Sequence, residues 1–174
     1  DAMLTDLQMI ENRLLEREPI QYVLGEAWFY HRRFRVTPSV LIPRPETEEL
    51  TEKAIRFLQT MEEPTVLDVG TGSGCIAISL QLECPQARVT GADISPAALE
   101  IAEMNGRHWQ APVNWMPLNV LDTDASAALP FFDLIVSNPP YIPQREKADM
   151  EVHVAFHEPA LALFVPDEQP LLFY

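Results

Sequence analysis

The chain of 174 residues has an apolar content of 47%, which is enough for one well-buried domain and a small appendage. Its 12 basic and 26 acidic residues give a net charge of −14, which disfavours direct binding to nucleic acid, because such proteins present a basic face. No apolar run approaches the roughly 18 residues of a membrane span, so we expect no membrane contact. The two cysteines, Cys75 and Cys84, fit a reducing compartment, and we expect a cytoplasmic protein.

The N-terminal part of the chain is expected to form a helix that is followed by a β-hairpin. Residues 3–17 carry apolar side chains at helical spacing, and Pro19 stops this helix. Because no capping residues precede the helix, we expect residues 1–18 to be the end of a helical domain, with the chain truncated there. Residues 19–44 are predicted to form a linking β-hairpin, whose charged tip lies at residues 31–33.

Residues 45–174 show the alternation of helices and strands that is typical of an α/β domain. Pro45 fits the first turn of a helix that runs to about residue 59, and Glu46 and Glu48 favour its positive end. Further helices are expected at residues 75–83 and 95–107, and strands at residues 66–69, 88–92, 113–116 and 131–137. This order predicts a doubly wound, mostly parallel, Rossmann-like sheet that is covered by helices on both faces.

The last of these strands, at residues 131–137, is apolar enough to predict a buried strand. A sheet of four strands would leave its last strand as an exposed edge, which folded proteins usually avoid. We therefore expect the chain to be truncated at its C-terminal side as well.

A glycine-rich loop, residues 70–74, lies between the first strand and the following helix, where a doubly wound sheet binds its ligand. A dinucleotide fingerprint would require a glycine in place of Cys75, and a phosphate-binding loop would end in lysine, so the loop disfavours a pyrophosphate ligand. Asp93 is placed to accept from ribose hydroxyls, and Asp68 from an ammonium group, directly or through water. These features predict S-adenosylmethionine as the cofactor. The alternative is that both aspartates serve only as turn and cap residues.

The stretch from Asn138 to Tyr141, Asn-Pro-Pro-Tyr, follows the last strand and is unusual for a loop. Two consecutive prolines keep the backbone extended and contribute no N–H, so that carbonyl groups are left free as acceptors. A stiff row of acceptors beside an aromatic ring suits a planar –NH2 group, either an amide or a nucleobase amine. The alternative is an ordinary loop with a capping asparagine and a packed tyrosine.

Metal binding is not expected. His153 and His157 are four residues apart and could face one ion, but the sequence offers no third ligand near them.

Together, the glycine loop and the Asn-Pro-Pro-Tyr stretch resemble those of class I S-adenosylmethionine-dependent methyltransferases. That stretch is shared by enzymes that methylate exocyclic amines of adenine or guanine and by protein glutamine methyltransferases. Four further stretches resemble the peptide chain release factor glutamine methyltransferases, the HemK/PrmC family; they are Gln21–Gly25, Leu41–Glu48, Glu158–Leu163 and Leu171–Tyr174. The resemblance extends from Glu18 to Tyr174. Members of that family carry an N-terminal helical domain and a seven-stranded sheet, of which this chain would supply about four strands.

The resemblance implies methyl transfer to the side-chain amide nitrogen of the glutamine in the Gly-Gly-Gln motif of release factors. The alternatives are a glutamine methyltransferase acting on a ribosomal protein and a methyltransferase acting on exocyclic amines of nucleic acid. The partner would be a release factor, with no direct contact to nucleic acid, and the enzyme is expected to be a monomer.

The resemblance also assigns roles to residues. Asn138 and the Pro139 carbonyl would accept the two N–H bonds of the substrate amide, Tyr141 would stack on it, and these three residues would be catalytic. Cofactor contacts would come from Asp68, Gly70, Thr71, Gly72, Ser73, Gly74, Asp93, Asn119, Val120 and Asn138. Substrate contacts would come from Asn138, Pro139, Pro140 and Tyr141, and we expect further ones from Arg44 and Glu46, which lie on the N-terminal side of the domain.

Two of these assignments leave alternatives open. Asn119 stands where the family usually has an acidic residue near the adenine, and Asp122 could serve instead. Arg44 or Glu46 would gate a substrate channel, unless the hairpin and the segment after it only join two domains.

Overall fold

The computed structural model describes residues 2–174, so of the expected N-terminal segment 1–18 only Asp1 lies outside the described residues. The first half of the chain forms α1 (Ala2–Leu15), α2 (Ile20–Leu24), β1 (Glu26–Phe29), β2 (Arg32–Arg35), α3 (Pro45–Leu58), β3 (Thr65–Val69) and α4 (Cys75–Glu83). The second half forms β4 (Arg88–Asp93), α5 (Pro96–Trp109), β5 (Asn114–Pro117), α6 (Thr123–Ala127), β6 (Leu134–Ser137), β7 (Ile142–Pro143), η1 (Gln144–Asp149), α7 (Val152–His157), α8 (Ala160–Leu163) and β8 (Phe164–Val165). The expected α/β alternation is confirmed.

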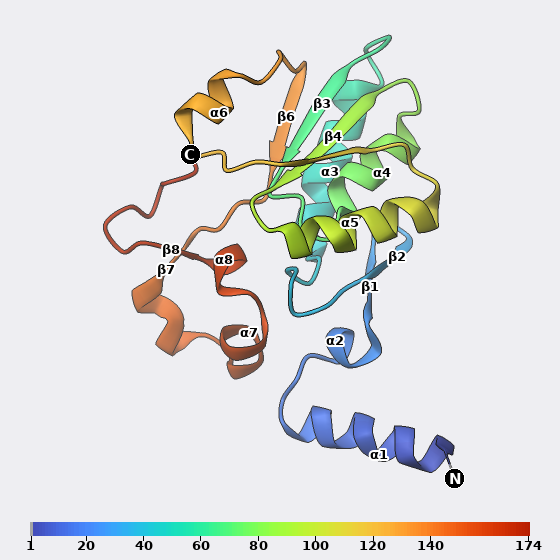
Figure 1. Ribbon diagram of the computed structural model, residues 1–174, viewed down its shortest axis with the longest axis vertical. Coiled ribbons are helices and arrows are strands. Elements are labelled where there is room, and N and C mark those ends of the chain that lie inside the picture. Colours follow the sequence, from blue (N-terminus) through green and yellow to red (C-terminus); the bar gives the residue numbers. More distant parts are fainter. Residues whose placement is uncertain (1) are drawn as a thin grey trace.

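The central sheet is parallel and has the strand order β5-β4-β3-β6. Figure 1 shows β4, β3 and β6 next to one another. The chain leaves β3 toward β4 and β5 on one side and returns to β6 on the other side of β3. This reversal of strand order makes the β3/β6 boundary the topological switch point, outside which doubly wound sheets bind ligands.

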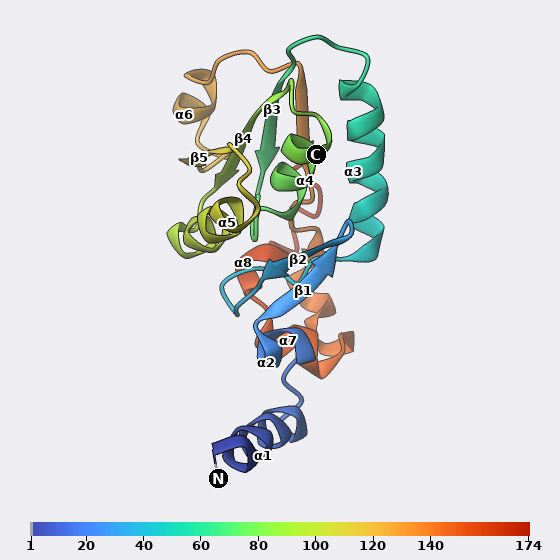
Figure 2. The same cartoon turned by 90° about the vertical axis from the view of Figure 1, so that its right-hand side faces the viewer.

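Helices cover the two faces of the sheet unequally. Val66, Val89 and Val136 belong to the main core, which also contains buried side chains of α3 and α4. On the other face Leu67 packs in a smaller cluster that includes Ala125 of α6. In Figure 2, α3 runs along one side of the sheet and α6 lies on the other. The expectation of helices on both faces is therefore confirmed.

The strand β6 differs from its prediction. It begins at Leu134, and of its residues only Val136 is buried, whereas Ile135 is 62% exposed. Phe131, expected in the same strand, lies before it and is fully exposed. The reason is position: β6 is an edge strand, and Ile135 points to the sparsely covered face. The expectation of an exposed last strand is confirmed, and the expectation of a buried one is wrong.

The hairpin β1–β2 packs into the body of the domain. Phe29 and Phe34 are 1% and 0% exposed within the main core, and their rings meet edge to face. Its two-residue turn consists of Tyr30 and His31, both with positive φ, so the charged tip expected at residues 31–33 is displaced by one residue. Arg32 and Arg33 belong to β2.

The helix α1 lies at one end of the molecule (Figure 1). Its side chains at Leu7 and Leu15 are 56% and 75% exposed. Arg13 donates two hydrogen bonds to Glu18, 2.6 and 2.5 Å long, which hold the pKa of that carboxyl below its usual range. Arg13 also reaches the carbonyls of Tyr22 and Val23, which connects α1 to α2.

After Tyr141 the chain forms a small subdomain of short elements, from β7 to β8. The two strands pair in parallel, and Arg145 donates its backbone N–H to Asp167 over 2.8 Å. The ammonium group of Lys147 lies over the rings of Phe156 and Phe164. Figure 1 shows this subdomain beyond the carboxyl ends of β3 and β6.

Candidate functional site

The two motifs singled out in the sequence meet at the switch point. Val69 and Ser137 are register partners at the ends of β3 and β6, so the glycine loop and Asn138 begin side by side on neighbouring strands. The Ser137 hydroxyl donates to the Val69 carbonyl over 2.7 Å and fastens the two strand ends together. The glycine loop and the Asn-Pro-Pro-Tyr stretch therefore border one site.

The glycine loop adopts a backbone that brings it close to the strand edge. Gly70, Gly72 and Gly74 have φ of 71°, 55° and 79°, a region that side chains with a Cβ rarely adopt. The N–H groups of Gly70 and Thr71 both donate to the Ala92 carbonyl, over 2.8 and 2.9 Å. Gly70 is exposed and Gly72 half-buried, so the backbone of the loop is open to a ligand.

Asp68 lies beneath this loop and is completely buried. Its Oδ2 accepts from the Thr71 hydroxyl at 2.6 Å and from the Ala77 N–H at 3.2 Å. Burial raises the pKa of Asp68 to about 7, although both hydrogen bonds act in the opposite direction. Its Oδ1 has no hydrogen-bond partner among residues 2–174.

Asp93 bridges the glycine loop and the start of α5. Its Oδ2 accepts from the Gly72 N–H and its Oδ1 from the Ser95 N–H, each over 2.9 Å. Ser95, the first residue of the helix predicted at residues 95–107, is the N-cap of α5 and accepts from the Ala98 N–H. Each oxygen of Asp93 keeps a second lone pair, so the carboxylate can shape the loop and still accept from a ligand hydroxyl.

Trp115 of β5 supports the loop from below, a role that sequence reasoning missed. A Cβ on Gly91 would lie 2.4 Å from its ring, and one on Gly74 would lie 2.9 Å from it. A Cβ on Gly106 of α5 would lie 3.1 Å from the same ring. Gly91 and Trp115 are register partners, so only a residue without a side chain leaves room for the indole. The sequence alone does not show that β4 pairs with β5 in this register, so the contact between Gly91 and Trp115 could not be predicted from it.

Asn105 of α5 connects the loop to the hairpin and was also missed. Its Nδ2 donates to the Ser73 carbonyl over 2.8 Å and to the Arg35 carbonyl over 3.0 Å. Its Oδ1 accepts from the Arg35 N–H over 2.8 Å. The sequence shows only an asparagine within an expected helix, which indicates neither its burial nor its partners.

The residues expected near the adenine lie after β5. Asn119 is exposed, and its Oδ1 accepts from the Leu121 N–H at 3.1 Å. Asp122 is the N-cap of α6 and accepts from the N–H groups of Asp124 and Ala125. Val120 is half-buried beside them. Both side chains thus make local hydrogen bonds, Asn119 through Oδ1 and Asp122 through Oδ1 alone, so the choice between them stays open.

Asn138 is held by a residue that lies far away in the sequence. Its Nδ2 donates to the hydroxyl of Thr47, in the first turn of α3, over 3.2 Å. The amide oxygen lies on the opposite side of Cγ and remains an acceptor. Pro139 and Pro140 are half-buried, and Tyr141 is 58% exposed, so its ring is available for a contact and does not pack as a core residue.

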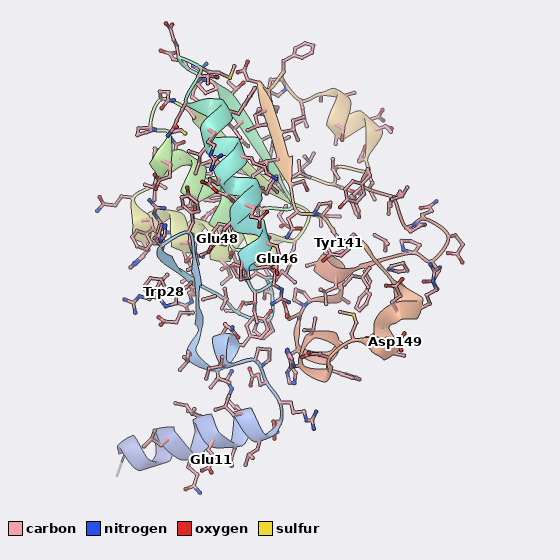
Figure 3. The ribbon with its side chains drawn as sticks, turned by 180° about the vertical axis from the view of Figure 1, so that it is seen from behind. Glu11, Trp28, Glu46, Glu48, Tyr141 and Asp149 are labelled. Atoms are coloured by element: carbon pink, nitrogen blue, oxygen red, sulfur yellow. The ribbon has the colours of Figure 1, made fainter. Side chains whose placement is uncertain are left out.

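The two residues proposed to gate a channel lie in different settings. Arg44 forms an ion pair of 2.5 Å with Glu158, whose side chain is 0% exposed and also accepts from the Ile42 N–H. Glu46 is exposed, and Figure 3 shows it with Glu48 on the same end of α3. Arg44 therefore joins the start of α3 to the C-terminal subdomain, an arrangement that does not suit a moving gate.

Within residues 2–174, no group of three or more His, Cys, Asp or Glu side chains is arranged to hold a metal ion. None of the helices in the same range is long and apolar enough to cross a membrane.

The residues present fit S-adenosylmethionine. Asp68 Oδ1 is a buried acceptor with unfilled capacity, of the kind that an ammonium group or a bridging water satisfies. Asp93 offers acceptors for ribose hydroxyls, and the exposed loop backbone allows close approach.

Comparison with known proteins agrees with this arrangement. The chain matches the family model of the methyltransferase small domain over residues 48–167, which is more than half of its length. The chain therefore belongs to the methyltransferase small domain family.

Two relatives carry a more particular name. A protein of Bacteroides thetaiotaomicron named release factor glutamine methyltransferase is 48% identical over 169 residues, covering 97% of this chain and 60% of that relative. One of the same name from Flavobacterium psychrophilum is 42% identical, covering 100% of this chain and 63% of the relative. The resemblance inferred from the sequence is confirmed, and the chain spans less than two thirds of the length of these relatives.

Among solved structures, a SAM-dependent methyltransferase from Agrobacterium tumefaciens has a TM-score of 0.54 at 22% identity, covering 66% of this chain and 39% of that one. This likeness confirms the Rossmann-like methyltransferase fold.

Proposed function

We propose that this chain is the methyltransferase part of a release factor glutamine methyltransferase. It transfers a methyl group from S-adenosylmethionine to the side-chain amide nitrogen of the glutamine in the Gly-Gly-Gln motif of peptide chain release factors. The observation that carries the proposal is the pairing of β3 with β6, which sets Asn138 directly beside the glycine loop. The names of the relatives support the choice of substrate.

The cofactor would be held mainly by the glycine loop and the two aspartates. The backbone from Gly70 to Gly74, including Thr71, Gly72 and Ser73, approaches it, Asp68 accepts from its ammonium group, and Asp93 accepts from its ribose. Asn119 and Val120 border the adenine, and Asn138 closes the site. When bound, the cofactor supplies a methyl group that its sulfonium centre has already activated.

The acceptor half of the site orients a poor nucleophile, because the lone pair of an amide nitrogen is delocalised into its carbonyl. The Asn138 side-chain oxygen and the Pro139 carbonyl accept the two N–H bonds of the glutamine and align the nitrogen with the methyl group. The same acceptors stabilise positive charge as it develops, as donors in an oxyanion hole stabilise negative charge. Pro140 keeps the backbone extended, and Tyr141 stacks on the planar amide. After alkylation the nitrogen releases one proton to solvent, so no strong base is needed.

The proposal also covers the residues around this site and the state of the enzyme in the cell. In this proposal the exposed Glu46 contacts the substrate at the rim of the site, and Arg44 stabilises the adjoining wall through its ion pair with Glu158. We further propose that the enzyme is a cytoplasmic monomer that binds a protein substrate, in keeping with its net charge of −14.

The test is methyl transfer from labelled S-adenosylmethionine to a release factor, with a ribosomal protein fraction and DNA as parallel acceptors. We expect label on the Gly-Gly-Gln glutamine. Asn138→Ala should lower turnover by about 10²- to 10³-fold, the loss typical for one transition-state hydrogen bond, with cofactor affinity nearly unchanged. Label on DNA or on a ribosomal protein alone, or unchanged turnover of Asn138→Ala, would refute the proposal.

A further inference from the structure

Thr47 is the residue that holds the side chain of Asn138. It lies in the first turn of α3 and is 8% exposed, and its hydroxyl oxygen accepts from Asn138 Nδ2 over 3.2 Å. An asparagine amide has a nitrogen end and an oxygen end, so a partner at the nitrogen end determines where the oxygen points. In this arrangement the oxygen is left for a substrate N–H.

The place of Thr47 in the helix explains why its hydroxyl is available. A threonine inside a helix usually donates to the carbonyl four residues earlier, as Thr51 does to the Thr47 carbonyl over 3.0 Å. Four residues before Thr47 is Pro43, which precedes the helix. Thr47 therefore lacks the carbonyl inside the helix that Thr51 uses, and its hydroxyl oxygen accepts from Asn138, directly after β6.

The turn that carries Thr47 is itself anchored on both sides. Arg44, three residues earlier, is paired with Glu158 of the C-terminal subdomain. Glu48, the next residue, accepts from the Tyr30 N–H at the hairpin turn over 2.9 Å. Because χ1 of a β-branched side chain has few choices, an anchored backbone also determines the position of the hydroxyl.

We propose that Thr47 is a positioning residue for catalysis, which holds the Asn138 amide in the orientation that presents its oxygen to the substrate nitrogen. This inference rests on the proposed function, since it assigns a supporting residue to the same acceptor site. In this proposal Thr47 acts through Asn138, to which its hydroxyl is bonded.

Three variants test this role in the full chain. Thr47→Val keeps the shape of the side chain and removes the hydroxyl, Thr47→Ser keeps the hydroxyl, and Thr51→Val is the control for losing a buried threonine hydroxyl from the same helix. We expect Thr47→Val to lower kcat by about 10- to 100-fold with little change in cofactor affinity, as misplaced catalytic groups do. Thr47→Ser and Thr51→Val should stay within about threefold of wild type. Equal losses in the two valine variants would overturn the proposal.

A second measurement depends on neither activity nor substrate. Solvent exchange of the Asn138 side-chain amide protons, followed by ¹⁵N-edited NMR, should be slow in the wild type and in Thr47→Ser and faster in Thr47→Val. Rapid exchange in the wild type would refute the hydrogen bond, even if Thr47→Val failed to fold. If no release factor is methylated, the proposed function fails, while the exchange data still decide whether Thr47 holds the Asn138 amide.

Discussion

The two halves of the site differ in how far apart in the sequence their interacting residues lie. In the cofactor half, Asp68 bonds to residues three and nine positions away, and Asp93 bonds to Gly72, 21 positions away. In the acceptor half, Asn138 is bonded to Thr47 across 91 positions, and Arg44 to Glu158 across 114. A cofactor loop can therefore be recognised from a short motif, whereas the acceptor site depends on how distant segments pack.

The largest effect should follow from breaking the longest contact. Arg44→Ala would leave Glu158 as a buried charge with the Ile42 N–H as its remaining bond, and we expect the free energy of unfolding to fall by about 3 kcal/mol. Urea denaturation measures this loss. The control is Arg56→Ala, because Arg56 pairs with Glu52 on the surface and its removal should cost no more than about 0.5 kcal/mol. Equal losses would mean that the acceptor half does not depend on the long-range pair.

In the cofactor half, the stability contributed by Asp68 should depend on pH. The raised pKa of Asp68, about 7, means that the folded protein binds this proton more tightly than the unfolded chain does. Stability from this group is therefore fully present below the unfolded pKa and is lost as pH rises through the folded one. Between pH 5 and pH 8 the loss should be roughly 2 kcal/mol.

Asp68→Asn removes this titration, so the variant should gain stability relative to wild type at pH 8 compared with pH 5. Urea denaturation of both proteins at the two pH values measures the gain, and the other titrating groups cancel in the difference. Parallel pH profiles of the two proteins would contradict the assignment.

The smallest effect is expected where Glu48 of α3 binds the hairpin turn. Glu48→Ala removes the acceptor for the Tyr30 N–H and should lower the free energy of unfolding by about 1 kcal/mol. Glu49, its exposed neighbour in α3, provides the control, and Glu49→Ala should change stability by less than about 0.5 kcal/mol. If the two variants proved equal in thermal or urea unfolding, the hairpin would not be anchored to α3 through Glu48.

The sequence by itself determined the local parts of this protein. The spacing of the glycines disfavoured a pyrophosphate ligand, the pattern of residues 95–107 predicted α5, and the alternation of strands and helices predicted the parallel sheet. These features depend on residues that lie close together in the chain, where backbone preference and hydrogen bonding act directly.

Only the tertiary structure decided the partners. It placed Thr47 against Asn138, buried Glu158 beside Arg44 and fitted Trp115 into the space left by Gly91. It also exposed Ile135, because an apolar run does not reveal which face of an edge strand the helices will cover. Contacts between distant segments follow from strand order and packing, and no local pattern contains that information.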